Sequence, residues 1–165
     1  MSTYRRRTHV DAPFEDVWSF HSRVAGLEAV TPPFLDLRVE RVVGPDGEVD
    51  PTVLTAGTRI TMSVRPLGVG PRVRWTSRID AREAGDDNAF FVDRMEDGPF
   101  PAWRHTHRFR AEDGGTLMQD EVRYRLPGGP VGRALGPFGL LGFEPMFRYR
   151  HRRTKELLEG RSVTA

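Results

Sequence analysis

The segment AWRHTHRFRAEDGGTLMQDEVRYR, residues 102–125, alternates polar and apolar side chains almost without interruption. A period of two is typical of β-strands that expose one face to solvent and bury the other. The tripeptide Asp113-Gly-Gly115 breaks the pattern in the middle and is typical of a tight turn. The segment therefore predicts two antiparallel strands, each with a solvent-facing and a buried side.

Charged side chains decide which face of each strand is buried. Arg104, Arg108 and Arg110 share one face of the first strand, so the other face must point into the protein. The inward residues of that strand are then Trp103, His105, His107 and Phe109. By the same parity the inward residues of the second strand are Met118, Asp120, Val122 and Tyr124. Two histidines and a carboxylate are thus predicted on the buried side.

A carboxylate buried beside an imidazole loses hydration energy unless the two groups pair, so we expect Asp120 to contact His105 or His107. Three interpretations remain open: a structural polar network, a general acid/base set formed by His105, His107 and Asp120, or a metal site. In the last case the His-x-His spacing would be completed by Asp120 or Asp93. Spacing alone is weak evidence, and no metal is assigned.

The period of two extends from Leu37 to Pro127, with turn sequences at 44–47, 67–71 and 85–88. An antiparallel meander is the arrangement that these breaks predict.

The flanking segments have other patterns. Tyr4–Val10 is a candidate first strand, and a helix from about Pro13 to Val24, with Asp11 as the N-cap acceptor, precedes a helical turn over 27–30. After the meander a Gly/Pro-rich loop over 128–142 leads to a long helix.

The long helix is expected from about Phe143 to Leu158, with Pro145 in its first turn. A sheet with one apolar face is covered most economically by curling around such a helix. The predicted fold is therefore α+β, a helix-grip fold: a curved antiparallel sheet wrapped around a long C-terminal helix, with two short helices after the first strand. We expect residues 1–160 to form a single domain.

A cavity is expected between the sheet and the helix. Parity places Phe91, Asp93 and Met95 on the inner face, and the stripe of Phe143 and Phe147 brings Arg150 toward the sheet. The candidate ligand-binding residues are Trp75, Phe91, Asp93, Met95, Phe100, Trp103, His105, His107, Phe109, Met118, Asp120, Tyr124, Phe143, Phe147 and Arg150.

Further residues are assigned by the same patterns. Phe34 and Phe138 are also expected inside, and the glycine-rich residues 136–142 are expected at the cavity rim. The charged side chains between them on the last helix are interpreted as a solvated face: Arg148, His151, Arg152, Arg153 and Lys155.

Composition excludes several classes of function. The 165 residues are 38% hydrophobic and carry a net charge of +2, which is typical of a soluble globular protein. There is no cysteine, no long apolar segment, and no apolar stretch behind the N-terminal arginines, so a cytoplasmic protein without an integral membrane span is expected. No compact basic patch with stacking aromatics indicates nucleic-acid binding. Phosphate loops and dinucleotide fingerprints are absent, so no cofactor is expected, and the chain is expected to be a monomer or homodimer.

Motifs spread over nearly the whole chain resemble the START-related (SRPBCC) superfamily, which includes polyketide cyclases/dehydrases, Bet v 1 allergens and coenzyme Q-binding proteins. They include Val10-Asp-Ala-Pro13, Gly57-Thr58 and the strand pair over 103–124. The resemblance implies a helix-grip domain that holds a hydrophobic small molecule such as a polyketide, an isoprenoid quinone or a lipid.

Two other functions are weighed beside this one. A cyclase/dehydrase-like enzyme would use a pocket His/Asp pair for proton transfer. A partner-binding module would use the basic last helix on a protein or membrane surface. Fold alone does not choose among them, because the superfamily hosts several activities.

Overall fold

The structure is a computed structural model that describes residues 1–135 and 140–160. Its helices and strands follow the predicted order. In chain order they are β1 (Ser2–Val10), α1 (Phe14–His21), α2 (Val24–Ala29), the 3-10 helix η1 (Pro33–Leu35), β2 (Arg38–Val43), β3 (Arg59–Val64), the 3-10 helix η2 (Pro66–Gly68), β4 (Val73–Ala84), β5 (Asn88–Glu96), β6 (Ala102–Glu112), β7 (Gly115–Arg125), α3 (Gly129–Leu135) and α4 (Leu140–Leu158).

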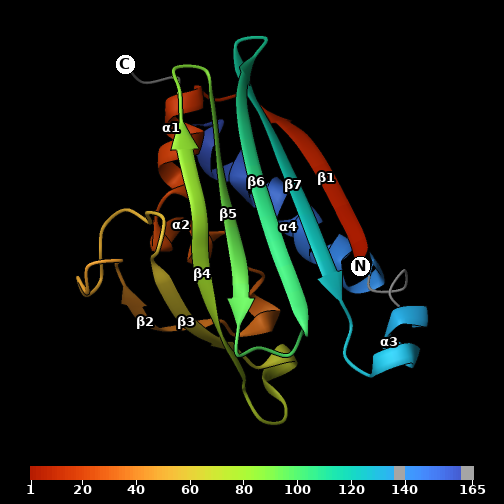
Figure 1. Cartoon of the computed structure of the whole chain (residues 1–165). Helices are drawn as coiled ribbons and strands as arrows, with labels where there is room; N and C mark the ends of the chain where they lie inside the picture. The colour runs from red at the N-terminus through yellow and green to blue at the C-terminus, as the bar shows by residue number, and fades with distance from the viewer. Residues whose placement is uncertain (136–139, 161–165) are drawn as a thin grey trace.

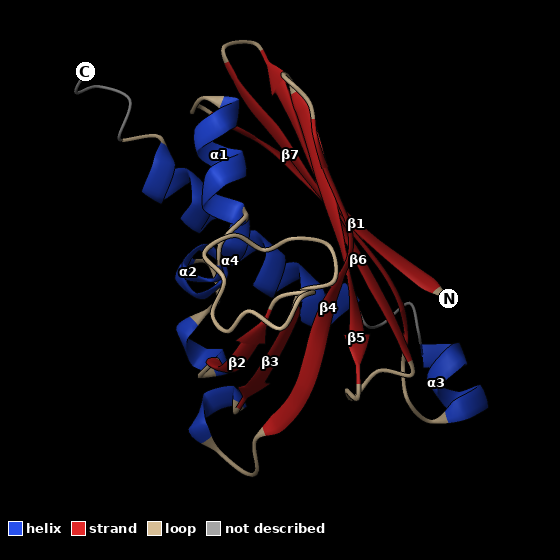
Figure 2. Ribbon diagram, turned by 60° about the vertical axis from the view of Figure 1, so that its left-hand side comes forward, coloured by secondary structure: helices blue, strands red, loops and turns tan. Residues whose placement is uncertain are grey.

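The strands form one antiparallel sheet in the order β1-β7-β6-β5-β4-β3-β2. The meander from β2 to β7 is thus completed by the N-terminal strand, which pairs with β7 (Figure 1). Viewed nearly along the sheet, α1, α2 and α4 lie on the same side of it (Figure 2). The predicted α+β helix-grip fold is confirmed.

Two apolar clusters lie between sheet and helices. The first gathers at α1 and the end of α4, where Trp18 and Phe109 bring their ring centroids to 5.5 Å and Leu158 is buried. The second lies at the other end of α4 and includes Tyr4, Tyr124, Phe143 and Phe147 among its members. Residues of β6, β7 and α4 that lie between these clusters carry the polar groups described below.

The first helical region differs in detail from the sequence prediction. The helix predicted to reach Val24 ends at His21, and Val24 begins α2. Asp11 does not cap α1, whose N-cap residue is Pro13 and has no side-chain cap hydrogen bond. The Asp11 carboxylate lies too early in the chain for that role and contacts the His9 ring instead, at 3.0 Å.

The segment predicted as a loop over 128–142 contains helix. α3 occupies Gly129–Leu135, and α4 begins at Leu140, so Pro145 lies inside the helix and not in its first turn. Phe34 was expected inside but is 47% exposed, because it lies on the short η1 turn at the surface. Residues 136–139, with Phe138, lie outside the described part of the chain, so their predicted place at the cavity rim is not described either.

Candidate functional site

A cavity of about 480 Å³ lies between the inner face of the sheet and α4. Most of the predicted ligand-binding residues line it, including Trp75, Phe91, Trp103 and Phe147. The polar residues that line it are His21, Thr31, Ser77, Asp93, His105, His107 and Arg150. An apolar space with a few convergent polar groups is the usual form of a small-molecule site.

Four of the predicted residues do not line the cavity: Phe109, Met118, Asp120 and Tyr124. All of them are buried in the core outside the set of residues that line the cavity. Phe109 and Met118 belong to the apolar cluster at α1, and Tyr124 packs edge-on against Phe143 at 4.7 Å. Strand parity predicts burial correctly, yet it does not distinguish the cavity wall from the core behind it.

Further residues that line the cavity were left out of the site by the sequence interpretation. His21 and Leu27 reach it from the α1–α2 region, and Ile60, Met62 and Ile79 reach it from β3 and β4. These strand residues alternate as a buried face should, but no polar neighbour marks them as part of a site.

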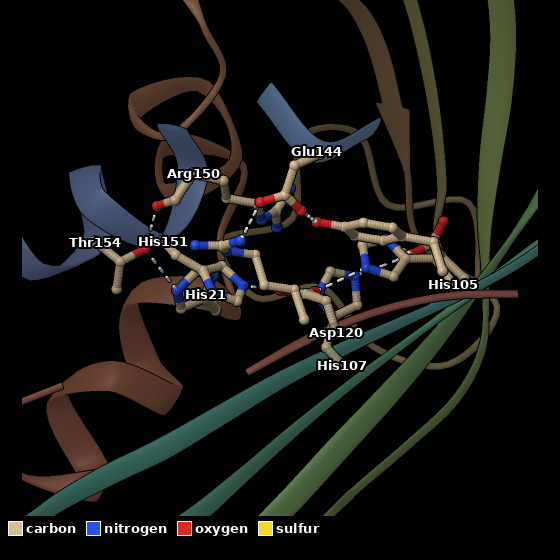
Figure 3. A network of polar contacts seen from close by, with 11 residues as sticks. His21, His105, His107, Asp120, Glu144, Arg150, His151 and Thr154 are labelled. Carbon is tan, nitrogen blue, oxygen red and sulfur yellow. Dashed lines mark hydrogen bonds and ion pairs between the residues drawn. The ribbon is translucent and has the colours of Figure 1, made fainter. Parts of the chain in front are cut away.

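Asp120 lies at the centre of a buried polar network (Figure 3). Its Oδ1 atom is 2.7 Å from His105 Nε2 and 2.9 Å from His107 Nδ1, so the expected pairing with these histidines is found with both. Its Oδ2 atom is 2.5 Å from Nε2 of His151 on α4. One carboxylate therefore joins two strands to the helix that crosses them.

His151 corrects the prediction of a solvated helix face. It is 2% exposed and belongs to the inner stripe of α4. The stripe that starts at Phe143 and Phe147 continues at a spacing of four or three residues through His151, Thr154 and Leu158, all of them buried. Following that period past Phe147 would have found His151; grouping it with the neighbouring arginines hid it.

Asp93 forms a second centre, on the cavity side of the two histidines. Its Oδ2 atom is 3.2 Å from His107 Nε2 and 3.6 Å from His105 Nδ1. The Ser77 hydroxyl donates to its Oδ1 atom at 3.1 Å. Antiparallel pairing of β5 with β6 sets Asp93 opposite His105, which brings the Asp93 carboxylate next to the histidine rings of β6. Each of the two rings thus lies between two carboxylates.

The surroundings of these groups shift their pKa values. Burial raises the pKa of Asp120, but hydrogen bonds from His105, His107 and His151 outweigh it and hold the pKa well below the usual range. The pKa of Asp93 is likewise lowered, because the histidines and Ser77 outweigh its burial. Burial, with repulsion from His107, lowers the pKa of His105 to about 4. At neutral pH both carboxylates are ionised and His105 is neutral.

A second polar pair lies beside this network. His21 Nε2 is 3.3 Å from the Thr154 hydroxyl, and burial followed by the charge of Arg150 lowers the His21 pKa well below its usual value. Arg150 faces the cavity, as predicted, but its Nε atom has no hydrogen-bond partner among the described residues.

Residues 10–146 match the family described as polyketide cyclase / dehydrase and lipid transport. The chain belongs to this family. The predicted START-related resemblance is thereby confirmed, and membership in the polyketide cyclase/dehydrase family supports hydrophobic ligand binding in general. No curated protein matches the chain in sequence. Among the described residues no helix is long and apolar enough to cross a membrane.

Solved structures with the same fold extend over nearly the whole chain. A protein from Thermus thermophilus is 20% identical, with a TM-score of 0.66, and the match covers 98% of this chain and all of the other. Norcoclaurine synthase from Thalictrum flavum, in complex with dopamine and hydroxybenzaldehyde, is 16% identical with a TM-score of 0.64, covering 98% of this chain and 88% of that one. A nucleoside-diphosphate sugar epimerase from Corynebacterium glutamicum is 27% identical with a TM-score of 0.60, but the match covers 93% of this chain and only 28% of the epimerase.

Proposed function

We propose that this protein binds a hydrophobic small molecule, such as a polyketide, an isoprenoid quinone or a lipid, in the cavity between the sheet and α4. The observation that carries the proposal is the cavity itself, whose volume of about 480 Å³ falls in the range of small-molecule sites. Family membership supports the same class of ligand.

The chemistry of the walls narrows the kind of ligand. Trp75, Phe91 and Trp103 present flat aromatic surfaces, which suit a ring system or a long apolar chain. Arg150 on α4 would hold a carboxylate or another anionic group of the ligand, and the histidines of β6 would meet an oxygen at the opposite wall. The related fold of norcoclaurine synthase holds dopamine and hydroxybenzaldehyde, which are likewise ring compounds with polar substituents.

Mass spectrometry of the purified protein under native conditions tests the proposal. An apolar compound released by organic extraction, at about one molecule per chain, is the expected result. A fluorescent apolar probe, 1-anilinonaphthalene-8-sulfonate, should also bind the extracted protein and be displaced by the extracted compound. Failure of both the co-purified compound and the probe to bind would overturn the proposal.

A matched pair of variants locates the binding. Val64 lines the cavity, so Val64→Trp should fill part of it and weaken probe binding at least tenfold. Val49, which is 64% exposed and does not line the cavity, supplies the control Val49→Trp. Equal affinity of the two variants would place the probe elsewhere on the protein.

A second function, a cyclase- or dehydrase-like enzyme, is favoured by one further observation. His105 is neutral and, with His107, lines the cavity beside ionised Asp93, so an imidazole could take a proton from a bound carbonyl compound while Asp120 fixes its orientation. The co-purified compound should then be converted by the wild-type protein. His105→Asn and His107→Asn should each lower kcat at least a hundredfold with little change in binding, whereas a compound that is bound but never changed would leave only the carrier function.

A further inference from the structure

Three atoms of the kinds that bind metal ions converge on one wall of the cavity. They are Asp93 Oδ2, His105 Nδ1 and His107 Nε2, and all lie within 4.8 Å of one another. The Asp93 oxygen is 3.2 Å from the His107 nitrogen and 3.6 Å from the His105 nitrogen. All three residues line the cavity, so an ion bound by them would be accessible from the cavity.

Asp120 determines which nitrogen of each ring carries a proton. An ionised carboxylate only accepts hydrogen bonds, so His105 donates through Nε2 and His107 donates through Nδ1, both to Asp120 Oδ1. The other nitrogen of each ring, Nδ1 of His105 and Nε2 of His107, faces the Asp93 carboxylate. A cation bound there would take the lone pairs of these two nitrogens, while each ring keeps its N–H on the Asp120 side.

Two carboxylates flank the rings in the interior, with the Asp93 side chain 14% and the Asp120 side chain 1% exposed, and a cation beside them would offset their buried negative charge. Ser77 and His151 donate to these carboxylates without needing to be charged. Arg150 on α4 also lines the cavity, and among the described residues it makes no ion pair with either carboxylate.

The geometry points to a site for a divalent transition metal ion, zinc above all, bound by Asp93, His105 and His107 with a fourth position open to the cavity. Ligands at 2.0–2.1 Å in tetrahedral zinc sites are about 3.4 Å apart, which lies between the two distances measured from Asp93. Asp120 is the outer carboxylate that faces the far nitrogen of both ligating histidines. Metal-ligating histidines almost always donate that N–H to a carboxylate, a backbone carbonyl or water.

This inference goes beyond the proposed function, because the site can be loaded without any organic ligand. The open position would take an oxygen of the bound molecule, such as a carbonyl, phenolate or carboxylate group, and the ion would polarise it as a Lewis acid. While these two histidine nitrogens bind a metal ion, they cannot also accept a proton from a bound molecule. Experiments with and without metal therefore distinguish metal binding from proton transfer by the free rings.

The test is isothermal titration calorimetry, in which zinc chloride is added to the folded, chelator-treated wild-type protein. We expect one zinc ion per chain. The visible absorption of a bound cobalt ion is more intense when the ion is four-coordinate. Cobalt chloride added to the protein should therefore produce a four-coordinate spectrum, and added zinc should abolish it by displacing the cobalt. The chain has no cysteine to compete for either ion. Absence of zinc binding to the folded wild-type chain would overturn the inference directly.

Variants assign the ligands. His107→Gln and Asp93→Asn should each weaken zinc binding at least a hundredfold, and Asp120→Asn, which leaves all three ligating atoms in place, should weaken it about 10–100-fold. The control is His9→Ala, because the His9 ring contacts Asp11 outside the cavity and offers the most similar alternative zinc ligand. Zinc binding that survives the cavity variants but is lost in His9→Ala would identify a surface ion and refute the site.

Circular dichroism and binding of the anilinonaphthalene probe accompany each titration. They separate a misfolded variant from a lost ligand, and they separate the two proposals from each other. Probe binding without zinc binding would leave the proposed function standing and refute the metal site. Zinc binding without binding of either the probe or a co-purified compound would support the metal site and overturn the proposed function.

Discussion

At the scale of single residues, Asp120 holds together three histidines from β6 and α4. Its replacement by alanine would leave three buried ring N–H groups without an acceptor. We expect Asp120→Ala to lower the free energy of unfolding by about 3–5 kcal/mol, the cost typical of breaking a buried ionic contact from one side. Urea unfolding followed by tryptophan fluorescence measures it.

The neighbouring residue supplies the control for Asp120. Glu121 pairs with Arg5, whose side chain is 65% exposed, so Glu121→Gln should cost less than about 1 kcal/mol. If the two variants lost equal stability, the network around Asp120 would be no more important than a surface ion pair.

His21 predicts a dependence of stability on pH. Its pKa in the folded protein is lowered by burial and then by Arg150, so between the unfolded value of 6.5 and the folded value the unfolded chain binds a proton that the folded chain does not. Stability should therefore fall as the pH falls below 6.5, by up to about 1.4 kcal/mol per pH unit from this residue. Urea unfolding of the chelator-treated protein from pH 7 to pH 5 should show it.

His21→Phe keeps a ring among its aromatic neighbours and removes the His21 titration, so it should reduce that slope and leave the part that buried His105, with a pKa of about 4, contributes. Half-buried His9 has a raised pKa, mainly because its ring bonds to the Glu112 carbonyl, and this stabilises the folded state at low pH. His9→Phe should leave the slope as steep or steeper. A slope unchanged in His21→Phe would mean that His21 is charged in the folded protein.

Sequence reasoning reaches part of the residue arrangement. Parity on two strands identifies His105, His107 and Asp120 as neighbours on an inner face, because alternation leaves only two choices and the arginines decide between them. It does not reach His151, since a helix offers several overlapping stripes and the adjacent arginines favoured the wrong one. Strand parity also does not predict that Asp93 and Asp120 lie on opposite sides of the histidine rings, because that depends on the registers of β5, β6 and β7.

At the scale of elements, α4 carries both apolar clusters and the polar groups between them. Phe147 is 1% exposed, packs against the Tyr4 ring at 5.1 Å and also lines the cavity. Phe147→Ala should lower the free energy of unfolding by about 3–5 kcal/mol and enlarge the cavity. The enlarged cavity should admit larger apolar probes than the wild type does.

Exposed Arg148 on the same helix gives the control Arg148→Ala, expected to cost less than about 1 kcal/mol because its contact with Glu144 lies at the surface. Denaturant unfolding and a series of probes of increasing size compare the two variants. If Phe147→Ala keeps the stability of the wild type and binds no larger probes than it does, the end of α4 must move inward to fill the space.

The elements that sequence reasoning missed are those whose local composition disagrees with their conformation. Gly129–Leu135 begins with glycine and proline, which favour a loop, yet it forms α3. Gly132 packs so closely that a Cβ atom there would be 2.0 Å from the Pro127 carbonyl oxygen. Only glycine fits at this close approach to the preceding turn, a requirement that hydrophobic periodicity does not show.

At the scale of the whole molecule, the cavity links occupancy to stability. An occupant that binds only the folded chain stabilises it by about 2.7 kcal/mol when its free concentration is a hundred times Kd. For a protein of this size, extraction should then lower Tm by roughly 5–10 °C, and adding the compound back should restore it. Val64→Trp should show a smaller shift, and a Tm indifferent to extraction would mean that the compound does not occupy the interior.

The architecture itself was predictable because the order of elements leaves few arrangements. A strand, short helices, a meander and a final long helix bury one sheet face only if the sheet curls around that helix. What could not be predicted is how much space remains inside. That depends on how far the sheet bends, to which the irregularity between Ile79 and Ala81 of β4 contributes, and on side-chain packing that no period encodes.

The pairing of β1 with β7 sets the order in which the protein is completed during synthesis. β1 is translated before the other described elements, but the strand that pairs with it among the described residues, β7, spans Gly115–Arg125, and α4 follows later still. The first strand must therefore wait, unpaired, until most of the chain has been translated, and the loop that its pairing closes favours slow folding. Nascent chains halted before residue 115 should be cleaved by protease within residues 2–10, and chains released in full should resist.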